Sequence, residues 1–87
     1  MIQAGKDMEM NIEAKIRTIM AEILEVNENE ILEDSSIGDI PSWDSLHHLE
    51  IIAEIEKNFG IQFTPDVLMD LEDFSDIVEA VNRRVAQ

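Results

Sequence analysis

The sequence predicts an all-α domain, a four-helix bundle of three longer helices and one short helix. Two observations support this fold class. Apolar residues recur at helical spacing through most of the chain, and the periodic stretches are bounded by helix-end signals such as Asp44, Gly60 and the Thr64-Pro65 pair. The length of 87 residues suits one domain. We expect residues 1–9, which lack a clear apolar period, to be a flexible N-terminal segment, and residues 10–87 to form the domain.

The first helix is predicted over residues 11–26, where one apolar face alternates with charged positions. We expect it to serve mainly as scaffold. Residues 27–43 then form a loop rich in Asn, Asp and Ser, which is long for so small a domain. Four apolar residues can pin this loop to the core: Ile31, Leu32, Ile37 and Ile40. Ordered loops of this kind often position a functional residue, and this one leads to Ser45.

The second helix is predicted over residues 45–59, with Asp44 as its N-cap and Gly60 just beyond its C-terminus. At about 100° per residue, its core face consists of Ile51, Ile52, Ile55 and Phe59. A second, narrower apolar stripe projects to nearly the opposite side, with acidic borders: Leu46, Leu49 and Ala53, beside Glu50, Glu56 and Lys57. Such a stripe predicts a partner that docks through apolar contacts and is selected by charge.

Two further helices follow. Ile61 and Phe63 are expected to point inward before Thr64 caps a short helix that starts at Pro65 and contains Val67, Leu68, Met69 and Leu71. The last helix is predicted from Asp73 or Phe74 to Val85, with two arginines near its C-terminus.

The charge of the chain restricts its partners. Twenty acidic residues against six basic ones give a net charge of −14, which argues against nucleic acid and anionic membrane surfaces and favours basic proteins. There is no cysteine, which excludes a disulfide, a thiolate nucleophile and a soft-metal site. We find no signal peptide or membrane span, so a cytoplasmic location is expected. A chain this short is also an improbable independent enzyme, because it has little material for an enclosed active site.

Ser45 occupies the most informative position. It lies in the first turn of a helix, where main-chain N–H groups are unpaired and the helix dipole favours an anion. A phosphate esterified to its hydroxyl would be well placed. The position suits a phosphoserine and a phosphodiester equally.

The motif around Ser45 resembles the carrier site of acyl carrier proteins and the wider phosphopantetheine-binding carrier family. It consists of Asp44-Ser45-Leu46, then Leu49-Glu50-Ile51-Ile52, closed by Phe59-Gly60-Ile61, and the likeness covers roughly residues 11–85. The resemblance implies that a separate phosphopantetheinyl transferase moves 4′-phosphopantetheine from coenzyme A to Ser45, with Asp44 contacting that transferase. The protein would then be no enzyme itself. It would be a monomer that delivers acyl thioesters to fatty-acid, polyketide or related biosynthetic enzymes.

The same resemblance assigns further residues. Acyl-transferring and acyl-modifying enzymes with basic docking patches would contact Leu46, Leu49, Glu50, Ala53, Glu56 and Met69. The acyl chain would lie between the second and third helices, beneath Ile52, Ile55, Phe59, Ile61, Leu68 and Leu71, although core packing explains these residues equally well. His47 and Met69 replace acidic residues common in fatty-acid carriers.

Several alternatives stay open at this point. One is a specialised carrier for secondary-metabolite, surface-lipid or aminoacyl groups. Another, of a different class, is an unmodified acidic helical adaptor that binds a basic partner. A metal or hydrolytic role for His47 and His48 is disfavoured, because neighbours on a helix point about 100° apart and no third ligand is evident. Trp43 is expected to pack the loop against the bundle.

Overall fold

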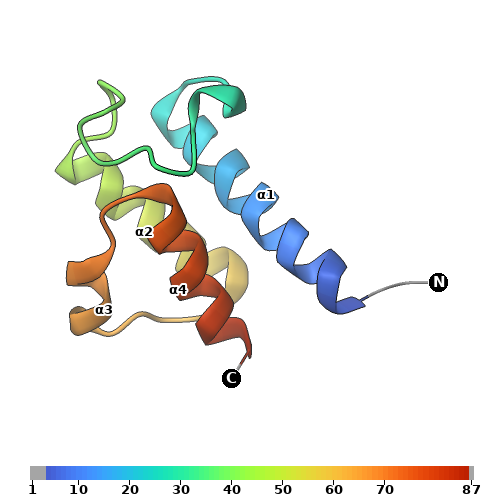
Figure 1. Cartoon of the computed structure of the whole chain (residues 1–87). Helices are drawn as coiled ribbons and strands as arrows, with labels where there is room; N and C mark the ends of the chain where they lie inside the picture. The colour runs from blue at the N-terminus through green and yellow to red at the C-terminus, as the bar shows by residue number, and fades with distance from the viewer. Residues whose placement is uncertain (1–3, 87) are drawn as a thin grey trace.

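The computed structural model describes residues 4–86, with side chains from residue 12 onward. Within these residues there are four α-helices, α1 (Ala4–Leu24), α2 (Ser45–Phe59), α3 (Pro65–Asp70) and α4 (Phe74–Ala86), and one short 3-10 helix, η1 (Glu28–Glu30). The described chain has no β-strand beyond two isolated bridges. The helix α1 runs along one side of the bundle, and α4 lies between it and the short α3 (Figure 1). The prediction of an all-α fold with three longer helices and one short helix is confirmed.

The first helix is longer than predicted at its N-terminal end. It begins at Ala4 instead of Asn11, and it ends at Leu24 instead of Val26. Ala4, Lys6 and Met8 favour helix even without an apolar period. The end is set by Glu25, whose φ of 58° is left-handed, and the N–H of Val26 donates back to the carbonyl of Ala21 at 3.1 Å. The flexibility expected of residues 1–9 stays a prediction, and residues 1–3 lie outside the described residues.

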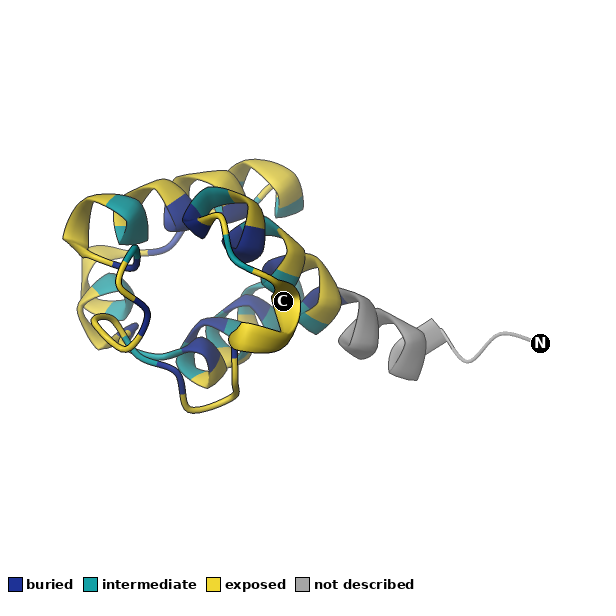
Figure 2. Cartoon of the chain, turned by 90° about the horizontal axis from the view of Figure 1, so that it is seen from above, coloured by how far each residue is buried: buried dark blue, intermediate teal, exposed yellow. Residues whose placement is uncertain are grey.

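The helices close around one apolar core. Coloured by burial, the helices turn their buried residues toward the middle of the bundle (Figure 2). The largest fully buried side chains come from the helices and from the α1–α2 loop: Trp43, Phe74, Ile16, Met20, Leu24, Ile31, Ile51, Ile55, Ile77 and Val81. Burial of this apolar surface is the main stabilising contribution to the fold.

Arg17 connects three parts of the bundle. Its Nε donates to the carbonyl of Ile31 at 3.1 Å, and its guanidinium lies 4.5 Å from the centre of the Phe74 ring. It therefore joins α1 to the following loop and to α4.

The loop between α1 and α2 is ordered by main-chain hydrogen bonds. The N–H of Phe74 donates to the carbonyl of the buried Ser35 at 2.9 Å, and the N–H of Ile37 donates to the carbonyl of Glu72 at 3.2 Å. Ile31 and Ile40 are buried, as predicted, but Leu32 is 58% exposed and Ile37 is 39% exposed. The prediction that all four residues pin the loop was wrong for these two. Hydrogen bonds to Glu72 and Phe74, just before and at the start of α4, hold this part of the loop instead.

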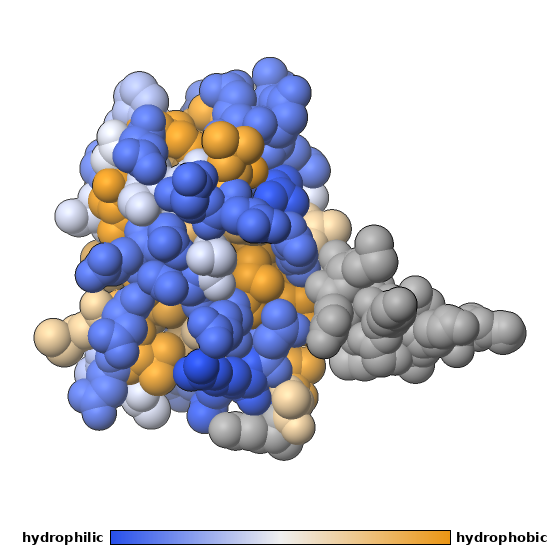
Figure 3. Space-filling view, in the orientation of Figure 1, coloured by the Kyte–Doolittle hydropathy of each residue, from blue (hydrophilic) through white to orange (hydrophobic). Residues whose placement is uncertain are grey.

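One face of the molecule is mainly polar. On the face drawn in Figure 3, hydrophilic residues predominate, and hydrophobic ones form separate patches among them. Among residues 4–86, none of the helices combines the length and apolar character needed to cross a membrane.

Candidate functional site

Ser45 lies where the sequence predicted it, at the first position of α2. Asp44 is the N-cap, in extended conformation, and its Oδ1 accepts the N–H of His47 at 2.9 Å. Ser45 is exposed, and its hydroxyl forms no hydrogen bond within the described chain. The first turn of α2 also carries no acidic residue. An accessible hydroxyl at the positive end of a 15-residue helix therefore fits a phosphodiester linkage.

The loop that leads to Ser45 is fixed from both directions. Ser42 Oγ donates to the carbonyl of Leu24 at 2.8 Å, which ties the loop to the end of α1. The N–H of Trp43 donates to the carbonyl of Ile40 at 2.8 Å, and the carbonyl of Trp43 accepts the N–H of Gly38 at 2.9 Å. The Trp43 side chain is completely buried, so the predicted packing of this residue is confirmed.

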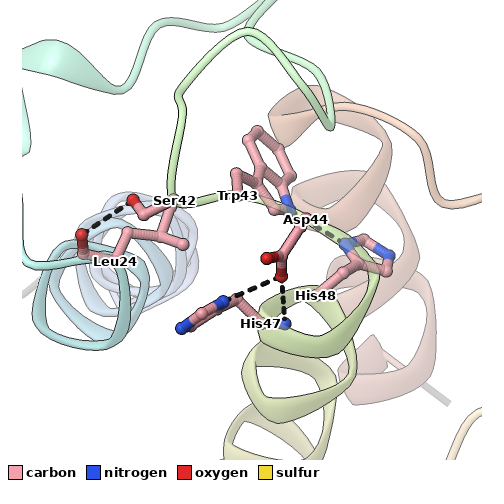
Figure 4. Close-up of polar contacts among 6 residues, drawn as sticks. All are labelled: Leu24, Ser42, Trp43, Asp44, His47 and His48. Carbon is pink, nitrogen blue, oxygen red and sulfur yellow. Dashed lines mark hydrogen bonds and ion pairs between the residues drawn. The ribbon is translucent and has the colours of Figure 1, made fainter.

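His47 pairs with the N-cap residue. Its Nδ1 lies 2.8 Å from Oδ1 of Asp44, as the dashed line in Figure 4 shows. The hydrogen bond to Asp44 raises the pKa of His47, and the charges of Asp44, Glu50 and Glu25 act in the same direction, against a smaller opposing effect of desolvation. In turn, the main-chain N–H of His47 and then its ring hold the pKa of Asp44 below its ordinary value. Asp44 is therefore engaged locally, on the same turn as Ser45.

His48 points the other way, toward Trp43 (Figure 4). Nε1 of Trp43 donates to Nδ1 of His48 at 3.1 Å, and the two rings stack with their centroids 6.0 Å apart. Burial lowers the pKa of His48, and a hydrogen bond with the main chain of Leu71 partly opposes this effect. Because Nδ1 is already occupied by the indole, it does not activate Ser45 as a base. Within the described residues, no group of three potential ligands among His, Cys, Asp and Glu is assembled for a metal ion.

The residues predicted to contact partners are largely on the surface. Leu46 and Leu49 are each 63% exposed, and Met69 is 78% exposed. Glu50 and Ala53 are also exposed. Their contact with partners remains a prediction.

Glu56 differs from the other members of this set. It is half-buried, and its Oε2 accepts the N–H of Phe63 at 2.9 Å. Its carboxylate therefore joins α2 to the segment before α3, a structural role that the sequence reasoning missed. Helical periodicity placed Glu56 at the border of the apolar stripe. It does not predict that the main-chain N–H of Phe63 would lie within hydrogen-bond distance of its carboxylate.

The six residues predicted to contact the acyl chain meet in one apolar cluster. Ile52, Ile55 and Leu71 are buried, and the other three, Phe59, Ile61 and Leu68, are half-buried and packed against the same cluster. The structure thus brings all six together, in an arrangement that core packing alone also requires. None of the six lines the open groove of about 760 Å³ that lies between α1 and α4.

That groove was not anticipated from the sequence. Its walls come from α1, from the α1–α2 loop and from the whole length of α4, including Ile12, Glu33, Phe74, Val78 and Val85. Val78 and Val85, which line it from α4, are half-buried.

Comparison with known proteins gives one family model and several relatives. The model described as "Phosphopantetheine attachment site" matches residues 14–81. The chain is 26% identical over 72 residues to an acyl carrier protein of Thermosynechococcus vestitus, covering 83% of this chain and 89% of that protein. It is 31% identical over 74 residues to an acyl carrier protein of Buchnera aphidicola, covering 85% and 94% respectively. A non-reducing polyketide synthase of Emericella nidulans is also 31% identical over 74 residues, which cover 85% of this chain and 3% of the synthase.

Proposed function

Because this chain belongs to the phosphopantetheine attachment family, as the match over residues 14–81 shows, we propose that it is an acyl carrier with Ser45 as its attachment residue. The observation that supports this assignment is the exposed, unbonded hydroxyl of Ser45 at the start of α2. The relatives of similar length are acyl carrier proteins, which agrees with a carrier that has no reaction of its own.

The attachment step places few demands on this chain. The oxygen of Ser45 forms a bond to the phosphorus of coenzyme A that bears the pantetheine, and the bond from that phosphorus to the adenosine bisphosphate leaving group breaks. The hydroxyl proton passes to a base of the transferase. Residues 40–50 contain no Lys or Arg, so the transferase and its Mg²⁺ supply the stabilisation of the phosphate charge. Once attached, the group ends in a thiol that holds acyl groups as thioesters.

The acyl chain is proposed to lie between α2 and α3. Ile52, Ile55 and Leu71 would form the floor of its site, Phe59 and Ile61 its edge, and Leu68 on α3 its movable side. The helix α3 supports this division, because it has only 6 residues and none of them is buried. A short helix held this weakly can shift outward to admit a chain.

Partner enzymes are proposed to dock on the exposed side of α2. Leu46, Leu49 and Ala53 supply the apolar strip, Glu50 supplies acidic charge beside it, and the net charge of −14 favours basic docking patches. The exposed Met69 on α3 adds apolar surface where fatty-acid carriers commonly have an acid, which favours partners of a specialised pathway. We further propose a cytoplasmic monomer whose carrier domain spans residues 10–87.

Mass spectrometry tests the assignment. Incubation with coenzyme A and a broad-specificity phosphopantetheinyl transferase should add one phosphopantetheine group. Ser45→Ala should abolish the addition. Ser42→Ala is the matched control, because Ser42 lies three residues away but is half-buried and bonded to Leu24. This variant should still be modified.

Two outcomes would refute the proposal. Modification that persists in Ser45→Ala would place the group elsewhere. A wild-type chain that stays unmodified would favour the acidic adaptor that binds a basic partner.

A further inference from the structure

One contact bridges the two sides of the attachment residue. Trp43 lies two residues before Ser45, and His48 lies three residues after it. The indole Nε1 donates to Nδ1 of His48 at 3.1 Å, and the rings stack at an interplanar angle of 26°. Trp43 is fully buried, and this hydrogen bond satisfies its side-chain N–H, which would be costly to bury without an acceptor. The contact thus closes the junction between the loop and α2 around Asp44 and Ser45.

The contact requires a particular form of His48. Nδ1 must be free of a proton to accept the indole N–H, so the proton of the neutral ring is on Nε2. The main chain of Leu71, beyond the end of α3, also interacts with the ring. Burial of the ring favours the same neutral form. His48 therefore connects Trp43, the start of α2 and the segment between α3 and α4.

We infer that His48 is a positioning residue for the modification of Ser45: by accepting the Trp43 indole N–H, it holds the loop–helix junction in the form that presents the Ser45 hydroxyl. The inference rests on the proposed attachment at Ser45. Asp44 and Ser42 are bonded to His47 and Leu24, on either side of the junction. Two side-chain contacts span Ser45, that of Asp44 with His47 and that of Trp43 with His48, and of these only the second involves a fully buried side chain. Since Nδ1 is engaged by Trp43, His48 acts through geometry, and proton transfer from Ser45 belongs to the transferase.

The test compares two replacements of His48. Asn offers a side-chain oxygen near the position of Nδ1, whereas Leu has similar bulk and no acceptor. We expect His48→Leu to lower kcat/KM for transferase-catalysed modification by roughly fivefold to tenfold, the factor that one ordinary hydrogen bond represents. The loss should be in kcat, with KM nearly unchanged, because the exposed strip on α2 is intact. His48→Asn should recover most of the rate.

Trp43→Phe provides an independent arm. It removes the indole donor from the other side, so we expect a loss similar to that of His48→Leu, and the double variant should be no slower than either single one. Circular dichroism checks that each variant is folded. Since Trp43 is the only tryptophan, its fluorescence also reports the contact directly and should change in His48→Leu more than in His48→Asn.

The outcomes separate the two proposals. Wild-type kinetics in a folded His48→Leu variant, or a His48→Asn variant as slow as His48→Leu, would overturn the positioning role alone. If His48→Leu does not fold, the rate of Trp43→Phe decides, and wild-type kinetics there would overturn it. A wild-type chain that is never modified at Ser45 would instead refute the proposed function.

Discussion

Replacement of Gly60 tests how α2 ends. Gly60 has a left-handed backbone, with φ of 65° and ψ of 36°, and its N–H donates to the carbonyl of Glu56. A Cβ built at Gly60 meets nothing within 4 Å, so the effect of Gly60→Ala comes from backbone conformation and not from a clash. The left-handed region costs a residue other than glycine about 1–2 kcal/mol. Loss of backbone entropy in the unfolded chain offsets part of this cost, so we expect a decrease of about 1 kcal/mol in the free energy of unfolding.

The assay is equilibrium unfolding by denaturant and by heat. For a domain of this size, a loss of 1 kcal/mol corresponds to a fall in Tm of about 4–8 °C. Gly60→Asn is the control, because asparagine tolerates the left-handed region better than alanine, and it should lose about half as much. Ser45 lies at the far end of the helix, about 22 Å away for 15 residues at about 1.5 Å each. The modification rate of the folded Gly60→Ala variant should therefore equal that of the wild type.

Two results would contradict this reasoning. An unchanged Tm for Gly60→Ala would mean that the backbone of residue 60 relaxes out of the left-handed region at no cost. Equal losses for Ala and Asn would mean that conformational strain is not the cause.

Three further predictions concern the histidines, the core and the exposed strip. In an NMR titration, His47 should titrate above and His48 below the ordinary histidine pKa, and Asp44→Asn should lower the value of His47 alone. By linkage, the stabilisation from charged His47 is lost as the pH rises through its raised pKa. The stabilisation from neutral His48 is instead lost as the pH falls below about 6.5. A common titration midpoint for the two histidines would contradict both assignments. Ile55→Ala should destabilise the fold by about 2–5 kcal/mol, measured by denaturant unfolding, because Ile55 is completely buried. Leu46→Ala should change stability by less than about 0.5 kcal/mol yet slow acyl transfer by a partner enzyme, and a large loss of stability there would show that Leu46 packs against the bundle.

Local signals in the sequence were sufficient for the ends of α2 and α3. Asp44, Gly60 and Thr64 act on the main chain within a few residues, by accepting an N–H or by adopting a left-handed φ, so their effect is readable without the fold. The same is true of the exposed side of α2, because helical periodicity places Leu46 and Leu49 opposite Ile51 and Ile55. The position of Ser45 followed directly from the helix start.

The tertiary structure alone decided which distant groups meet. Ile37 donates to Glu72 just before α4, Glu56 accepts the N–H of Phe63, and Ser42 donates to the carbonyl of Leu24 at the end of α1. No periodicity encodes these contacts, because each depends on how the chain returns between helices. The sequence by itself therefore determined where the reactive hydroxyl lies, at the start of a helix with an outward apolar strip. How firmly the loop holds that hydroxyl was decided only when the separate segments packed together, because the bonds that fix it join residues from different parts of the chain.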